Sequence, residues 1–172
     1  VAMIGDAKFE TLAEALAAAQ AGDTVTLLED LSLSQILTID KAITLDGNGK
    51  KLTSTAARAV NVSGADGVTI KNVTIKGAAL TNGIETYNCG DATENVIGSM
   101  ENVTIDAQGT GMLISAPCGT ATNCSISGGV HGIEIWIKGN YSASLDLVSS
   151  TVEGGVYAHD EFNSNPDLVN NG

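Results

Sequence analysis

The feature that most constrains this sequence is a short apolar–polar–apolar motif that recurs at irregular spacing. Its copies are ITL at Ile43, VTI at Val73, VTI at Val103, CSI at Cys124 and STV at Ser150, separated by 30, 30, 21 and 26 residues. A glycine follows every copy except the third, where Ala107 stands. Strands that keep their register while loops vary in length are typical of a solenoid of stacked coils, whereas leucine-rich and propeller repeats have a fixed length.

The composition agrees with short stacked strands. Hydrophobic residues make up 43% of the 172 residues, enough for one domain with a continuous core, while aromatic residues make up 3% and glycine occurs 20 times. The net charge of −12 disfavours nucleic acid and anionic membrane surfaces as partners. No apolar run approaches the roughly 20 residues of a membrane helix, so we expect no membrane insertion. Because Val1 stands where an initiator Met is usual, we expect a mature or excised piece.

The N-terminal segment predicts one amphipathic helix over residues 11–21. Thr11 followed by Glu14 is the pattern of a capping box, an apolar stripe follows, and Gly22 is the expected stop. After Gly22 the apolar period changes to two, which indicates strands. We therefore expect a cap over residues 1–23.

The stretches AGDTV (residues 21–25) and AITLDGNG (residues 42–49), after an amphipathic helix, resemble the pectin-lyase-like superfamily of right-handed parallel β-helices. The resemblance implies an all-β, right-handed parallel β-helix of about five coils, its open end covered by the N-terminal helix. The expected divisions are the cap at 1–23, the β-helix at 24–161 and a polar tail or linker at 162–172. The resemblance is to bacterial-type surface and secreted proteins, and it therefore implies an extracellular or cell-surface location.

A second column of strands follows the motif and defines an outer strip. If Val60, Ile84, Met112, Ile133 and Val156 point inward, alternation fixes which side chains point outward. One outward line is then Asn61, Glu85, Leu113, Glu134 and Tyr157, and its neighbour is Ser63, Tyr87, Ser115, Trp136 and His159. The only tryptophan of the chain would thus lie on a surface ladder beside carboxylates.

Aromatic faces beside acids and hydroxyls are suited to sugar rings, and the resembled family binds polysaccharide along this strand face. We therefore expect a carbohydrate-binding or adhesive module with a polysaccharide or glycan ligand. The expected ligand-binding residues are Tyr87, Trp136, Tyr157, His159, Glu85, Glu134 and Ser115. The opposing interpretation is that a long loop covers these rings as ordinary packing.

Two further functions stay open, an enzyme and a structural spacer. Glu85 and Glu134, two coils apart, would be separated by about 9.6 Å, near the carboxylate spacing of inverting glycoside hydrolases. A lyase is disfavoured because the matching columns contain neither Asp nor Arg. Neither His131 nor His159 has a companion at metal-ligand spacing, so we expect no metal and no cofactor.

The cysteines and the asparagines give expectations about register. Cys89 and Cys118 follow equivalent positions on adjacent coils, so we expect a disulfide between them under oxidising conditions, with Cys124 a buried thiol. Asn72, Asn102 and Asn123 precede successive strands and predict a stacked amide ladder at a corner, although each begins a glycosylation sequon.

The last coil needs a cover, which predicts further domains or end-to-end self-association.

Overall fold

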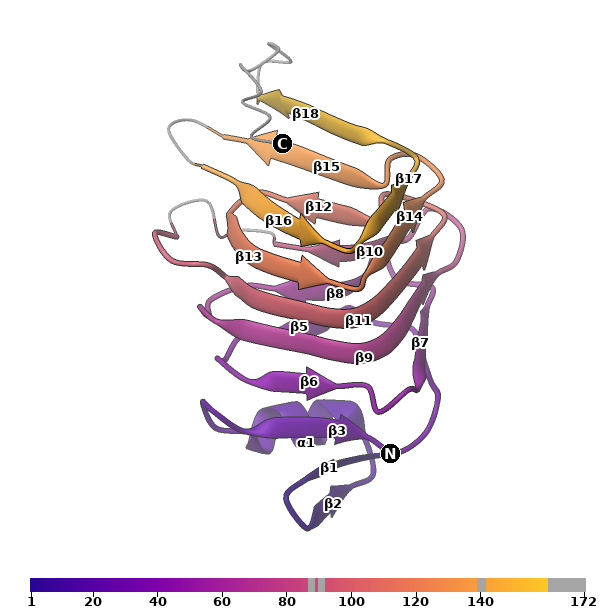
Figure 1. Ribbon diagram of the computed structural model, residues 1–172. Helices are drawn as coiled ribbons and strands as arrows, with labels where there is room; N and C mark the ends of the chain where they lie inside the picture. Colours follow the sequence, from indigo (N-terminus) through magenta and orange to yellow (C-terminus); the bar gives the residue numbers. More distant parts are fainter. Residues whose placement is uncertain (87–88, 90–91, 139–141, 161–172) are drawn as a thin grey trace.

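The computed structural model describes residues 1–160 apart from 87–88, 90–91 and 139–141. Its strands stack as successive coils of a parallel β-helix, with the N-terminal elements at one end (Figure 1). The strands lie on three faces of the coil, which we name A, B and C. Among the residues described, no helix combines the length and the apolar character needed to cross a membrane.

Each face is a column of parallel strands. Face A contains β3 (Thr24–Leu27), β6 (Thr44–Asp46), the first half of β9 (Val68–Gly77), the first half of β11 (Ile97–Ala107), β13 (Pro117–Thr122) and β16 (Ser144–Val148). Face B contains β4 (Leu31–Leu33), β7 (Lys51–Ser54), the second halves of β9 and β11, β14 (Ser125–Gly128) and β17 (Thr151–Glu153). Face C contains β5 (Leu37–Ile39), β8 (Arg58–Val62), β10 (Asn82–Glu85), β12 (Met112–Ile114), β15 (Ile133–Ile137) and β18 (Val156–Asp160).

The six strands of face C define six coils, one more than the repeat indicated. The repeat began at Ile43, so the coil formed by β3, β4 and β5 was not counted. One alignment was also wrong. Leu45 pairs with Ile70 on face A, not with the VTI motif at Val73, which lies on face B. The cause is that β9 holds two similar apolar stretches, one on each side of a corner.

The inward register predicted for face C is confirmed. Ile84 pairs with both Val60 and Met112, Met112 pairs with Ile133, and all four side chains are buried. Val156 continues this row but is 55% exposed because it belongs to the last coil. Cys124 occupies the inward place after Val103 and is buried, as expected.

Successive coils approach closely where the chain enters face C. Gly83, Gly111 and Gly132 stand one above another at this corner, and a Cβ atom on Gly111 would lie 2.5 Å from the carbonyl oxygen of Gly132. No side chain fits at that distance, so only glycine allows the coils to stack at the normal strand spacing there.

The predicted helix forms, but it is shorter than expected. α1 spans Leu12–Ala18, and its capping box joins the backbone and side chains of Thr11 and Glu14 in both directions, at 3.1 and 3.2 Å. The helix ends before Gly22, because the Ala19 backbone turns to an extended conformation (φ −59°, ψ 143°). The Lys41 ammonium caps this end by donating to the carbonyl oxygens of Leu16, Ala17 and Ala19 at 2.9–3.0 Å. Before α1, β1 (Ala2–Ile4) pairs antiparallel with β3 and with β2 (Ala7–Phe9).

An amide ladder lies at the corner between faces A and B. Asn72, Asn102 and Asn123 all have a φ of 53°, a left-handed conformation that asparagine tolerates better than most residues. Asn102 Nδ2 donates to Asn72 Oδ1 at 3.1 Å, and Asn72 Nδ2 donates to Asp46 Oδ1 at 3.1 Å. The predicted ladder is therefore confirmed for Asn72 and Asn102, and Asp46 is its first member.

Asp46 has a pKa below its ordinary value because of these partners. Partial burial raises the pKa, but the hydrogen bonds from the Asn48 backbone and from Asn72, together with the Lys71 ammonium at 3.4 Å, outweigh burial. A lowered folded-state pKa stabilises the fold above the unfolded-state pKa, near 3.9, and this contribution disappears as the pH falls through the folded-state value.

The three cysteines are buried thiols. Cys89 Sγ donates to the carbonyl oxygen of Val62 at 3.2 Å, and Cys118 Sγ lies 3.7 Å from that of Ala116. The structure does not join these two, and their bridge under oxidising conditions stays a prediction. Burial raises the pKa of Cys118 to about 12. A backbone hydrogen bond with Ile97 lowers this pKa in part, and the electrostatic effect of the neighbouring Cys89 raises it.

Replacing Asp46 with Asn should lower stability in a pH-dependent way. We expect a loss of about 1 kcal/mol at neutral pH, where the carboxylate accepts its hydrogen bonds, and a smaller loss at about pH 3 as wild-type Asp46 becomes protonated. Urea unfolding at both values measures this. The matched control is Asp106→Asn, which removes an exposed pair with Lys76. An equal loss at both pH values for Asp46→Asn would contradict the account.

The Cys118 thiol should resist alkylation in the folded protein. Because the thiolate is the nucleophile, a pKa of about 12 predicts a reaction with iodoacetamide at about pH 8 that is at least about a hundredfold slower than in the unfolded chain. Peptide mapping by mass spectrometry, with and without urea, gives the rates. Rapid labelling of Cys118 in the folded protein would show that the burial described here is wrong.

Candidate functional site

The candidate site lies on the outer surface of face C at the two coils farthest from the N terminus. β15 and β18 pair in parallel with Glu134 beside Tyr157 and Trp136 beside His159. These four side chains point outward because Ile133 and Ala158, which alternate with them, are buried in the core. Trp136 is half-buried and Tyr157 is 42% exposed, so the described residues do not bury the rings completely.

Four aromatic rings stack face to face in a row across these coils, and we name them the ring row. His131 stacks on Tyr157 with centroids 4.7 Å apart, Tyr157 on His159 at 5.0 Å, and His159 on Trp136 at 6.1 Å. The planes of neighbouring rings differ by only 9–27°. Because the two middle rings have neighbours on both faces, a ligand ring can stack fully only on the outer face of His131 or Trp136, and the middle rings present their edges.

Glu134 connects the ring row to the preceding coils. One carboxylate oxygen lies 2.8 Å from His159 Nε2, and the other accepts from Thr110 Oγ1 at 3.2 Å. His159 Nδ1 lies 3.2 Å from the carbonyl oxygen of Asp160. Both imidazole nitrogens thus lie within hydrogen-bond distance of an oxygen atom, and the tautomer determines which nitrogen donates.

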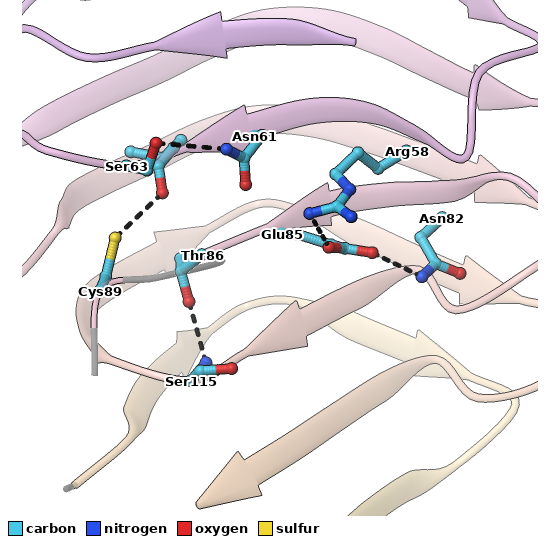
Figure 2. A network of polar contacts seen from close by, with 9 residues as sticks. Arg58, Asn61, Ser63, Asn82, Glu85, Thr86, Cys89 and Ser115 are labelled. Carbon is cyan, nitrogen blue, oxygen red and sulfur yellow. Dashed lines mark hydrogen bonds and ion pairs between the residues drawn. The ribbon is translucent and has the colours of Figure 1, made fainter. Parts of the chain in front are cut away.

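Glu85 lies in a different environment from Glu134. Its side chain is buried, Arg58 Nη1 lies 2.8 Å from one carboxylate oxygen, and Asn82 Nδ2 donates to the other at 2.7 Å (Figure 2). Leu113 stands between Glu85 and Glu134 in the register. The two acids predicted as a pair are therefore engaged separately, each with its own partners.

The two remaining predicted site residues are Ser115 and Tyr87. Ser115 lies one coil before Trp136, and its backbone N–H donates to Thr86 Oγ1 at 2.9 Å (Figure 2). Tyr87 lies outside the described residues. The structure thus brings together Trp136, Tyr157, His159 and Glu134, while Glu85 belongs to the buried network with Arg58.

The polar contacts form one continuous chain across five coils. Arg58 and Asn82 both contact the Glu85 carboxylate. The Asn82 side-chain oxygen accepts a hydrogen bond from the Thr110 backbone N–H at 2.7 Å. The Thr110 hydroxyl donates to Glu134, which contacts His159. Arg58, Asn82, Thr110 and His131 were not anticipated as members of the site. Arg58 and Asn82 begin strands, and His131 and Thr110 lie in corners, so the alternation of side chains along the strands does not point to them.

The other candidate features of the described residues hold no comparable chemistry. Among the residues that the structure describes, no group of three or more His, Cys, Asp and Glu could hold a metal ion. A depression of about 230 Å³ lies at the N-terminal end between α1 and the start of face C, lined by Ala13, Leu16, Ala17, Ile36, Leu37, Thr38, Asp40 and Lys41. The Lys41 ammonium there is already bonded to three helix carbonyl groups.

Comparison with known proteins identifies the family but gives no individual relative. No curated protein and no solved structure matches the chain. The family model described as "Right handed beta helix region" matches residues 58–172, which is more than half of the chain. This match agrees with the parallel stacking on faces A, B and C, and the right-handed parallel β-helix predicted from the sequence is confirmed. The chain belongs to the right-handed β-helix family.

Proposed function

We propose that this chain binds carbohydrate through the outer surface of face C at β15 and β18. The observation that carries the proposal is the partly exposed ring row beside a carboxylate. The outer face of the Trp136 indole offers an apolar surface to the C–H face of a sugar ring. Glu134 can accept hydrogen bonds from sugar hydroxyls, and the edges of Tyr157 and His159 add polar groups nearby.

The charge distribution favours a neutral glycan over an acidic one. The chain carries a net charge of −12, and the Glu134 carboxylate contacts His159 of the ring row. A uronic acid or sulfated sugar would have to approach this negative field without a described Arg or Lys pairing with the rings. A neutral oligosaccharide avoids that repulsion.

A binding or adhesive module in an extracellular or cell-surface protein is the role most consistent with this surface. Hydrolysis is the weaker alternative, because both oxygens of Glu85 are bonded to Arg58 and Asn82 and its side chain is buried. An inverting mechanism needs two carboxyl groups that both reach the substrate. Only Glu134 of the pair adjoins the rings.

A structural spacer is the second candidate, and the polar chain from Arg58 to His159 favours it. Such a chain satisfies polar groups from coil to coil and stiffens the face without any ligand. The two functions differ in whether an added glycan binds to this face, which a comparison of variants can measure.

Trp136→Ala should strongly weaken glycan binding with little effect on the fold. We expect at least a tenfold loss of affinity for any glycan identified on an array of neutral plant, mucin and bacterial oligosaccharides, measured by calorimetry. The unfolding free energy should fall by about 1 kcal/mol, because the half-exposed indole loses mainly its contact with His159. The matched control is Leu80→Ala, which removes an exposed apolar side chain outside the strip. A stability loss of about 3–5 kcal/mol, typical of buried aromatic residues, would support packing instead of binding.

Glu134→Gln should separate binding from catalysis. The amide keeps the shape and part of the hydrogen bonding with Thr110 and His159, but it cannot exchange a proton at neutral pH. A binding module should retain measurable affinity, and neither protein should release sugar products in chromatographic analysis. Product release by wild type that disappears in Glu134→Gln would contradict the binding proposal and favour the hydrolase.

A further inference from the structure

The last coil exposes side chains that every other coil buries. On face A the inward row is Val25, Leu45, Ile70, Met100, Ala121 and Leu147, in the observed register. The first five are fully buried, whereas Leu147 is 42% exposed. Val156, the inward residue at the start of β18, is 55% exposed. Within the described residues, no strand pairs with the far side of β16.

The amino-acid sequence after β18 repeats the pattern of β16. Asp146-Leu147-Val148 recurs as Asp167-Leu168-Val169, 21 residues later, which is also the distance from Val103 to Cys124 on adjacent coils. The connection is long enough when equivalent positions are compared. Ile114, Ile135 and Ala158 are equivalent on successive coils, and residues 115–119 connect Ile114 to Thr120 while residues 136–145 connect Ile135 to Asp146. Residues 159–166, between Ala158 and Asp167, are intermediate in length.

The residue that follows each face A strand gives independent support for the repeat of the β16 pattern at residues 167–169. Asn102, Asn123 and Ser149 follow the face A strands of successive coils, and all three have a positive φ of 49–53°. Asn170 follows Val169 and is one of the residue types that best tolerates this conformation. Pro166, immediately before the motif, is tolerated in a strand only at an edge or at its first residue.

We propose that the exposed end of coil 6 is a docking surface for residues 167–170 of this same chain. The segment adds a parallel strand to β16, with Leu168 over Leu147 and Asn170 at the corner that continues Asn123 and Ser149. The docked strand satisfies the outer backbone groups of β16 and removes the Leu147 side chain from water. Asp167 then lies beside Asp146, and this repulsion weakens docking at low ionic strength.

Strand alternation supplies a matched pair of variants for the full-length chain. Leu168 is the inward position and Val169 the outward one, so Leu168→Asp should undock the segment and Val169→Asp should leave it docked. The readout is hydrogen exchange, by mass spectrometry, of β16 amides. We expect at least tenfold faster exchange in Leu168→Asp than in wild type and less than a twofold change in Val169→Asp, while β9 and β11 stay protected in all three proteins.

Three results would overturn this docking. Exchange in β16 that is as slow in Leu168→Asp as in wild type would show that Leu168 covers nothing. Equal acceleration by both substitutions would show that no alternating strand forms. Protection of β16 that rises with protein concentration, together with a dimer in analytical ultracentrifugation, would identify a second copy as the occupant of this end. Glycan binding is measured separately, so failure of either proposal leaves the other intact.

Discussion

Parallel backbone hydrogen bonding between successive coils is the interaction on which the rest of this structure depends. It holds each strand in register with the next, so that inward apolar residues such as Ile84, Met112 and Ile133 stack in one row. Because side chains alternate, a slip of one residue would turn that whole row to the surface and bury its polar neighbours. The same hydrogen bonds place Trp136 beside His159, so the candidate site is a direct result of the register.

The corners protect this register by different means. Where the chain enters face C, glycines allow the backbones to approach, and at the corner between faces A and B a ladder of amides ends on Asp46. At the N-terminal end, α1 and Lys41 close the first coil. The uneven loop lengths in the sequence are compatible with a regular core because these corners, and not the loops, determine how the coils stack.

Local patterns predicted a large part of this fold because their causes are local. The Thr11 capping box, the amide ladder at Asn72 and Asn102 and the alternation on face C each depend on a few neighbouring residues, and all were anticipated. The equivalence of Ile43 and Val73 was wrong because β9 has two nearly identical apolar stretches, and only long-range pairing distinguishes them. The ion pair of Glu85 with Arg58 was missed for a different reason. The register of their two strands was predicted correctly, but Arg58 begins its strand, outside the alternating positions that defined the expected site.

The ring row on face C is the surface at which we propose that this protein works. Since Trp136 is the only tryptophan, its fluorescence reports on this surface alone. Titration with a neutral oligosaccharide that binds the protein by calorimetry is the most direct test. The account predicts a saturable change in Trp136 emission with the same dissociation constant as the calorimetric one. Calorimetric binding that leaves the emission unchanged would place the glycan elsewhere and contradict the claim.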